Sequence, residues 1–233
     1  SLGLKHGFEC ETQGTLFYSI ARIIASKKPK IIFLENVRNI VSHNKGETFN
    51  IIKKTIKDLE YDFQFSLVDS STVVPQRRVR CFMVGIRKDY FKQFGKFIFP
   101  KFDGDPLPLK NILENNPDED YYISDKLWNG HLKRTERNIK RGTGFTAHTA
   151  NLNKPSNTIV ARYGKDGKEC LIQDRNGNPR FLTKDECRIL FGYSNDFILP
   201  KSKTVTYKQF GNSVVVPVVA KIFENISKQY NLL

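Results

Sequence analysis

The stretch "IIFLENVRNI", residues 31–40, places a carboxyl and an amide group directly after four consecutive apolar residues. Such a run predicts a strand over residues 31–34 that is buried on both faces, with Glu35 and Asn36 at its carboxyl end. Ligands of doubly wound sheets bind beyond the carboxyl ends of the strands. A partly desolvated carboxyl group there can keep its proton and donate it. By itself, however, so short a pattern favours a Glu that caps a loop or forms an ion pair.

Gln76, Arg78 and Arg80 alternate along the stretch "VPQRRVRCFMVGIR". On a strand they would project from one face, while Arg77 and Val79 would take the other. Two guanidinium groups and an amide on one face can bind a carboxyl group, a phosphate or the edge of a base. The alternative is a strand edge protected by solvated charge, where Lys would be the more usual residue.

A third polar cluster, Gly211-Asn212-Ser213, directly precedes an apolar helical pattern in "YKQFGNSVVVPVVAKI". The free N–H groups at the start of a helix favour anions and small polar ligands. Taken alone, the cluster is better explained as an ordinary helix cap.

Hydrophobic periodicity predicts the elements that must position these residues. Helical spacing predicts helices over residues 15–27, 47–59, 183–190 and about 214–230, and alternation predicts strands over 61–67 and 79–86. Thr183 and Glu186 are spaced as a capping box at the start of the third helix. Together with the strand at 31–34, this order predicts part of an α/β sheet with an antiparallel edge.

Residues 100–180 have another character, because they are rich in Pro, Asn, Asp, Gly and Lys and contain only short apolar runs. This composition predicts a smaller, loop-rich second domain. We therefore expect residues 1–99 to belong to the α/β domain, residues 100–181 to form the second domain, and residues 182–233 to return to the first.

The composition indicates the kind of partner and compartment. The 38 Lys and Arg residues against 24 Asp and Glu give a net charge of +14, which is typical of proteins that bind phosphate-rich partners, although some proteins are basic only for solubility. The four cysteines form no C-x-x-C pair and the four histidines do not cluster near them, which argues against a metal site and favours a reducing compartment. No apolar run approaches the roughly 20 residues that span a bilayer. We expect a cytoplasmic protein with no membrane partner.

In this order, the motifs resemble those of the bacterial DNA (cytosine-5)-methyltransferases, which transfer a methyl group from S-adenosyl-L-methionine to carbon 5 of cytosine. The resemblance extends over residues 14 to about 226 and is weak only in the middle. It implies part of a Rossmann-like S-adenosylmethionine-dependent methyltransferase sheet, with residues 100–181 as a small target-recognition domain. The matching stretches are "GTLFYSIARIIASKKPKIIFLENVRNI", "PQRRVRCFMVGIR", "FLTKDECRILFGYSNDF" and "YKQFGNSVV".

The resemblance implies catalytic roles for four residues. Glu35 would contact N3 of the target cytosine while a cysteine thiolate attacks carbon 6, and Asn36 would hold the surrounding loop. Arg80 would contact O2 of the cytosine, and Arg78 would lie near a backbone phosphate. Because this chemistry needs the base outside the duplex stack, the resemblance also implies base flipping.

Further residues are implied to bind DNA. Gln76 belongs to the same arginine motif, and Thr158 in "PSNTIVARYG" matches a residue that contacts the phosphate beside the flipped nucleotide. The stretch "RNIKRGTGF" offers three cations beside glycines that let DNA approach the backbone, although a solvated helix face also explains each of them: Arg137, Lys140 and Arg141.

The cofactor site that the resemblance implies is incomplete. Leu16 would line the adenine pocket, and Asn212 and Ser213 would lie near the amino-acid end of S-adenosyl-L-methionine. The family's Phe-x-Gly-x-Gly loop, its acidic ribose-binding residue and its Pro-Cys nucleophile have no counterpart in this sequence. Cys10 aligns after the active loop, and Gln13 replaces the family's usual Arg.

We therefore predict the C-terminal part of a cytosine-5 methyltransferase of a restriction-modification system, which binds double-stranded DNA. Methyl transfer would need an N-terminal part with the nucleophilic Cys, in the same longer chain or in a second subunit, and this chain alone would be inactive. One alternative is a non-catalytic DNA-binding remnant. Another is RNA methylation by the same fold, against which the long middle segment argues.

Overall fold

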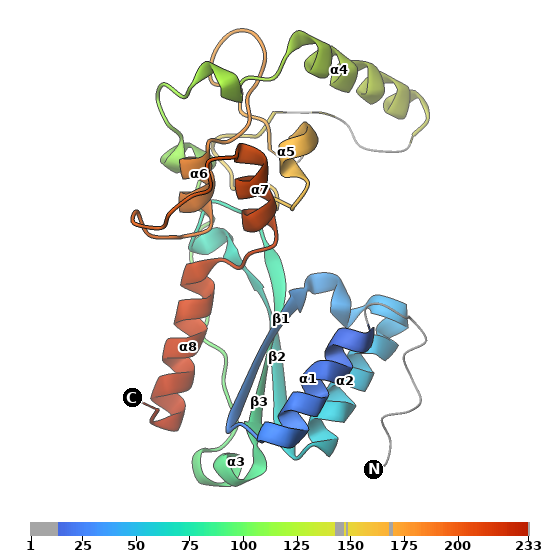
Figure 1. Cartoon of the computed structure of the whole chain (residues 1–233), viewed down its shortest axis with the longest axis vertical. Helices are drawn as coiled ribbons and strands as arrows, with labels where there is room; N and C mark the ends of the chain where they lie inside the picture. Colours follow the sequence, from blue (N-terminus) through green and yellow to red (C-terminus); the bar gives the residue numbers. More distant parts are fainter. Residues whose placement is uncertain (1–13, 143–146, 148, 168–169, 233) are drawn as a thin grey trace. The chain divides into compact units, whose positions relative to one another are not determined.

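A computed structural model describes residues 14–142, 147, 149–167 and 170–232 (Figure 1). The chain divides into two compact units. The first, which we call the sheet unit, comprises the chain up to residue 68, residues 79–101, and residues from 221 onward. The other, which we call the second unit, comprises residues 69–78 and 102–220. The chain therefore passes between the units four times.

Among its described residues, the sheet unit holds three strands, two helices that precede or separate them, and two helices that follow. These are α1 (Gly14–Lys27), β1 (Ile31–Val37), α2 (Glu47–Asp58), β2 (Tyr61–Asp69), β3 (Val79–Arg87) and α3 (Lys88–Phe94), with 3-10 turns at Arg38–Val41 and His43–Gly46. The most C-terminal helix, α8 (Val216–Tyr230), lies in this unit from residue 221.

The sheet has the strand order β1-β3-β2, and β1 pairs antiparallel with β3. Backbone hydrogen bonds from Lys88 to Glu60 and from Ser70 to Arg78 close the two ends of the β2–β3 hairpin. The antiparallel strand is therefore central among the described strands. The prediction that it forms an edge was wrong, because β3 returns between β1 and β2 rather than beside β2 alone.

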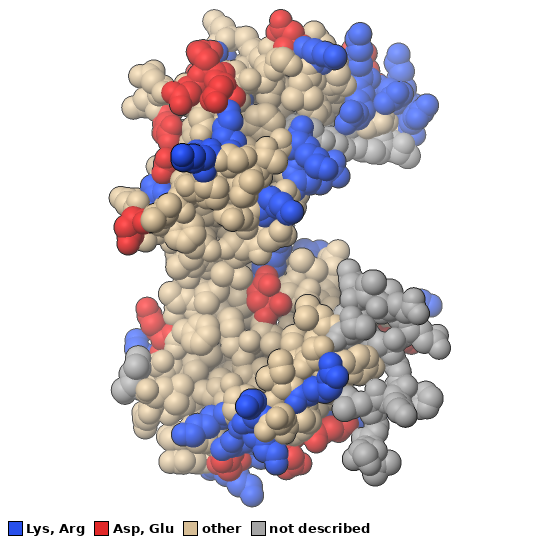
Figure 2. Space-filling model, viewed as in Figure 1, with Lys and Arg blue, Asp and Glu red and all other residues tan. Residues whose placement is uncertain are grey.

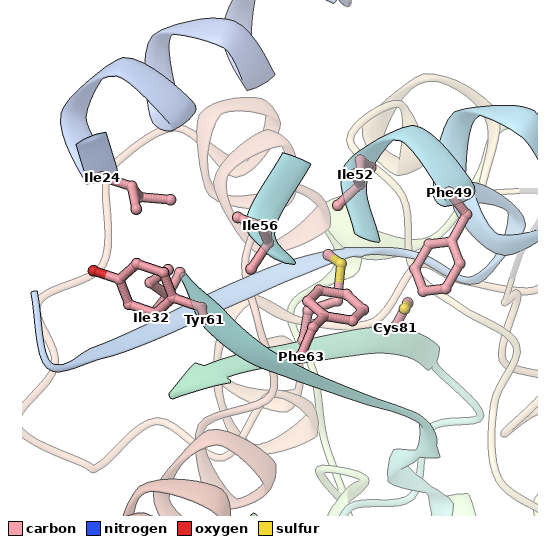
Figure 3. Close-up of a cluster of buried hydrophobic side chains, with 9 residues drawn as sticks. Ile24, Ile32, Phe49, Ile52, Ile56, Tyr61, Phe63 and Cys81 are labelled. Atoms are coloured by element: carbon pink, nitrogen blue, oxygen red, sulfur yellow. The ribbon is translucent and has the colours of Figure 1, made fainter. Parts of the chain in front are cut away.

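Helices cover both faces of the sheet. The side chains of α1 and α2 pack on one face in a continuous hydrophobic cluster (Figure 3). On the other face, the rings of Phe33 and Phe82 stack with centroids 5.8 Å apart, and Phe223 of α8 lies 4.8 Å from Phe33. Burial of apolar side chains on both faces explains why β1 begins with four apolar residues. The cluster beneath α1 and α2 consists of Ile24, Ile32, Phe49, Ile52, Ile56, Tyr61, Phe63, Cys81 and Met83.

The predicted helices and strands of the sheet unit are confirmed to within two residues, except at β1. This strand continues to Val37, three residues further than predicted. Glu35 and Asn36 thus lie within the ladder, opposite Phe82 and Cys81, and not beyond the end of the strand. The strand continues because β3 supplies backbone partners through this stretch.

The second unit contains more helix than its composition suggests. Its elements are α4 (Asp125–Lys140), α5 (Tyr163–Asp166), α6 (Lys184–Leu190), α7 (Lys203–Gly211) and 3-10 turns at Ser70–Thr72, Leu109–Ile112 and Glu119–Tyr121. Sequence periodicity missed α4, α5 and α7, as it missed α3 in the sheet unit. Among the residues of α4 only His131 is buried. Leu127, Trp128, Leu132 and Ile139 recur at helical spacing in this helix, but they are few in a segment dominated by charged residues.

Helix α6 begins as predicted. The Thr183 hydroxyl accepts a hydrogen bond from the Glu186 N–H at 3.0 Å, and Oε2 of Glu186 accepts one from the Thr183 N–H at 2.7 Å. Both oxygens of Glu186 also bind the guanidinium of Arg180, at 2.8 and 2.9 Å, and both side chains are fully buried. This ion pair joins residues on the two sides of the predicted boundary at 181/182. Residues 182–220 accordingly cluster with the second unit, and the chain returns to the sheet unit at residue 221, within α8.

Candidate functional site

Glu35 of β1 and Arg80 of β3 form the central pair of the candidate site in the sheet unit. Arg80 lies opposite Val37, two residues along from the partner of Glu35, so both side chains project from the same face of the sheet. Oε1 of Glu35 lies 3.2 Å from Nε of Arg80, and the two side chains keep 27% and 14% of their surface exposed. Burial lowers the pKa of Arg80, and the Glu35 carboxylate partly offsets this. The pair offers a carboxylate and a guanidinium, side by side, to a polar ring.

Asn36 lies on the opposite face of β1 and is exposed. Its Oδ1 accepts a hydrogen bond from the Val37 N–H at 2.8 Å. The side chain therefore fixes the backbone at the end of the strand, which is compatible with the predicted role of holding this segment.

Cys81, which pairs with Asn36 across the ladder, is a poor nucleophile. Its thiol is fully buried, and burial together with the negative charge of Glu35 raises its pKa to about 11. Of the other cysteines, Cys170 and Cys187 are buried, and Cys10 lies outside the described residues. The three described thiols are hydrophobic core residues.

Cys81 is expected to resist alkylation by iodoacetamide at pH 8 in the folded chain. A pKa of about 11, against an ordinary value of 9.0, leaves roughly a hundredfold less thiolate, and burial slows access further. The extent of labelling can be read by mass spectrometry of the Cys81 peptide, with the urea-unfolded chain as the labelled control. Rapid native labelling would contradict the structure. Because the unfolded thiol ionises first, the free energy of unfolding is unaffected below pH 9 and falls as the pH rises toward 11.

Gln76 and Arg78 lie in the interior of the second unit. The Gln76 amide donates to the carbonyl of Leu190 at 3.3 Å and accepts from the N–H of Ile159 at 2.9 Å, and the residue is fully buried. Arg78 donates to three main-chain carbonyls and stacks over a phenyl ring. Those contacts are with Ile159 at 2.9 Å, Gly211 at 3.1 Å, Ser213 at 2.6 Å and the ring of Phe191, whose centroid lies 5.1 Å away.

This arrangement corrects the prediction that Gln76, Arg78 and Arg80 form one ligand-binding face. The regular strand begins only at Val79, so the alternation across residues 76–80 does not lie on one strand. Gln76 and Arg78 use their polar groups on the backbone of the second unit, and only Arg80 joins Glu35. The first two side chains are therefore structural in this conformation, and contacts from them to DNA or phosphate stay a prediction that needs a rearrangement.

Thr158 lies in a segment that pairs with the arginine motif. Gln76 and Ser156 form a parallel bridge, the Arg77 N–H donates to the Ser156 carbonyl at 2.8 Å, and the Thr158 hydroxyl donates to the Arg77 carbonyl at 2.7 Å. Two motifs some 80 residues apart thus meet in the second unit. The partly exposed Thr158 hydroxyl is engaged with backbone, and its contact with a DNA phosphate stays a prediction.

Asn212 and Ser213 follow α7 and do not directly precede α8. Asn212 is the exposed C-cap residue of α7, whereas α8 begins only at Val216. The Ser213 hydroxyl contacts the hydroxyl of Tyr193, and the Ser213 carbonyl accepts from Arg78. The helix start predicted at about residue 214 was therefore two residues too early, because α7 and the turn after it were not recognised. Tyr193 is a polar neighbour of this segment that the sequence did not single out.

The remaining predicted residues are exposed. Leu16 on α1 keeps 69% of its surface accessible, which is unusual for a leucine on a packed helix. Arg137 and Lys140 lie in the last turn of α4 and Arg141 caps its end, and all three are exposed. Gly142 beside them adopts a φ of 62°, whereas Gly144 lies outside the described residues.

The structure therefore forms two clusters from the predicted residues. Glu35, Asn36 and Arg80 belong to the sheet unit, while Gln76, Arg78, Thr158 and the segment 211–213 are hydrogen-bonded together in the second unit. Arg78 and Arg80 stand on the two sides of the point where the chain passes from the second unit into β3.

Comparison with known proteins identifies the family. Residues 1–228 match the family model described as C-5 cytosine-specific DNA methylase. The chain belongs to this family. It is 46% identical over 230 residues to the Type II methyltransferase M.SsoII of Shigella sonnei, with 96% of this chain and 59% of that protein covered. It is 42% identical over 226 residues to the Type II methyltransferase M1.ScrFI of Lactococcus lactis subsp. cremoris, with 96% and 58% covered.

The chain thus spans about three fifths of the length of these methylases. Among solved structures, a mutant of the DNMT2 protein of Spodoptera frugiperda superposes with a TM-score of 0.71 over 97% of this chain and 75% of that one, at 19% identity. This likeness shows that the α/β sheet is that of a methyltransferase fold, as the resemblance implied. No helix in the described part of this methylase-family chain is both long and apolar enough to cross a membrane.

Proposed function

We propose that this chain supplies the cytosine-holding and DNA-recognising part of a DNA (cytosine-5)-methyltransferase of a restriction-modification system. The observation that carries the proposal is the half-buried pair of Glu35 and Arg80, 3.2 Å apart on one face of the sheet. In the family that the chain belongs to, both positions are implied to contact the same flipped cytosine. A carboxyl group that faces N3 and a guanidinium that faces O2 must lie this close to hold one ring.

The proposed role of the pair is to hold the base and control one proton. Glu35 faces N3 of the cytosine and supports protonation of this atom, which makes carbon 6 more electrophilic toward a thiolate. Arg80 donates to O2 and orients the carboxyl group of Glu35 through their contact. Cys81 is too basic and too buried to act as the nucleophile, so in this proposal the thiolate comes from the Pro-Cys segment of the N-terminal part, which has no counterpart in this sequence.

S-adenosyl-L-methionine supplies the methyl group in this proposal. Leu16 presents an exposed apolar surface that suits an adenine ring, and Asn212 presents an exposed amide that suits the amino-acid end of the cofactor. Ser213 fits less directly, because its hydroxyl already contacts Tyr193. Neither Leu16 in the sheet unit nor Asn212 and Ser213 in the second unit form a cofactor pocket by themselves, which supports the need for a further part of the enzyme.

The proposal is tested by reconstitution with a polypeptide that carries the Phe-x-Gly-x-Gly and Pro-Cys segments of a close relative. We expect transfer of labelled methyl groups to duplex DNA from the mixture and none from this chain alone. Glu35→Gln should reduce the rate by roughly a hundredfold or more, because the amide cannot supply the proton to N3. Duplex RNA in place of DNA should accept no label.

Glu60→Gln is the matched control. Glu60 also forms an ion pair in the sheet unit, with Lys88 at 2.7 Å, but both side chains are largely exposed. Its replacement should leave the rate unchanged. An active Glu35→Gln mixture would refute the proposed role of the carboxyl group. Complete inactivity of every mixture, with DNA affinity retained, would instead favour the non-catalytic DNA-binding remnant.

A further inference from the structure

Helix α4 carries its cations on a single face. With 3.6 residues per turn, six basic residues fall within an arc of about 120°. Both acidic residues of the helix, Asp125 and Glu136, fall outside that arc. All six cations are exposed, and Figure 2 shows Lys and Arg side chains gathered over the C-terminal end of α4. We call this set the α4 stripe; it consists of Lys126, Lys133, Arg134, Arg137, Lys140 and Arg141.

A hollow of about 280 Å³ adjoins the stripe. Two residues of the stripe, Lys126 and Arg134, line it together with Ser124, Leu127, Gly130 and the buried His131. A Cβ atom on Gly130 would meet no atom within 4 Å. Gly130 therefore leaves the hollow open, whereas a large side chain at this position would occupy it.

We propose that the α4 stripe binds the sugar-phosphate backbone of duplex DNA, with one phosphate seated in the hollow over Gly130 between Lys126 and Arg134. This inference rests on the proposed function in taking DNA as the partner, and it adds Lys126, Lys133 and Arg134 to the predicted contacts. The residues at 126 to 140 extend over about 21 Å of helix, which is long enough to follow several successive phosphates. A stripe of cations without acidic residues is more complementary to polyanionic DNA than to a protein surface that carries charges of both signs.

Contacts of this kind position a protein without reading sequence. The affinity should therefore depend steeply on salt and little on base sequence. Each lost phosphate contact lowers the slope of log K against log salt concentration by about 0.9. Because Lys126 and Arg134 share one phosphate in this proposal, Lys126→Gln combined with Arg134→Gln should lower the slope by about 0.9 and the affinity at 0.1 M salt by about tenfold.

The experiment measures binding of the full 233-residue chain to two fluorescein-labelled 30-base-pair duplexes of unrelated sequence by anisotropy at several salt concentrations. The matched control is Lys54→Gln combined with Lys57→Gln, which removes the same charge from exposed positions on α2. We expect the α4 variant to lose affinity equally for both duplexes and the α2 variant to retain it. Gly130→Leu should fill the hollow and weaken binding about tenfold at unchanged net charge, while Gly130→Ala should stay close to the parent chain.

Three outcomes would overturn the inference: no DNA binding by the parent chain, equal losses in the α2 and α4 variants, or an unchanged salt slope after removal of Lys126 and Arg134. A preference for a 30-base-pair RNA duplex over DNA would reject the proposed partner. None of these measurements involves methyl transfer. The inference about the α4 stripe can therefore be wrong while the reconstituted enzyme is active. Equally, the stripe can bind DNA while the mixture transfers no methyl group.

Discussion

Replacement of Gly211 by Ala is expected to destabilise the second unit by more than about 3 kcal/mol. A Cβ atom at this position would lie 2.1 Å from the backbone N of Ala161 and 2.2 Å from the carbonyl C of Val160. These are main-chain atoms, so no side-chain rotation can relieve the clash. The end of α7 would have to move away, and the contact of Arg78 with the Gly211 carbonyl would be strained with it. Urea unfolding followed by circular dichroism measures the loss.

Gly130→Ala is the matched control for this substitution. Gly130 lies within α4, and an added Cβ atom there meets nothing within 4 Å. The same chemical change should therefore raise the free energy of unfolding by about 0.5–1 kcal/mol, through the better helix propensity of Ala. If Gly211→Ala unfolded at the same urea concentration as the parent chain, the close approach of α7 to residues 160–161 would not exist in solution.

Most of the elements that the sequence predicted correctly are those that bury apolar side chains against the sheet. The stretches over α1, α2, β2 and β3 carry apolar residues at regular spacing because each packs on the sheet, and their predicted bounds were confirmed. Helix α4 has one buried residue, His131, and its few helically spaced apolar residues lie in a strongly polar segment, so composition suggested a loop-rich region instead. The end of β1 was misjudged for a related reason: Glu35 and Asn36 are polar, yet β3 continues to supply them with hydrogen-bonding partners.

The candidate site was predictable in its residues more than in its geometry. The motif resemblance named Glu35 and Arg80, but their contact follows from a strand register that neither motif contains. Alternation suggested that Arg78 and Arg80 share a face. The structure separates them, because the chain changes compact unit between these two residues. Charge and spacing alone could not distinguish an arginine that faces a ligand from one that binds backbone carbonyls.

The main effect expected of Arg78→Met is therefore a loss of stability. Arg78 is buried and donates to the carbonyls of Ile159, Gly211 and Ser213. Methionine fills a similar volume but leaves these carbonyls without their donor, at about 1–3 kcal/mol for each group that stays buried. Removal of a buried charge offsets part of this cost. We expect a net loss of about 3 kcal/mol in the free energy of unfolding, measured by urea denaturation.

Arg77→Met provides the comparison, because the neighbouring side chain is 69% exposed and only approaches Asp69 at 3.8 Å. Its replacement should change stability by less than about 0.5 kcal/mol. If the two arginines contributed equally, the contacts of Arg78 would not hold the second unit together. If the Arg78→Met chain were as stable as the parent chain but had lost DNA affinity, the predicted contact between Arg78 and a phosphate would be supported instead. Arg78 would then have to leave its three carbonyl partners when DNA binds.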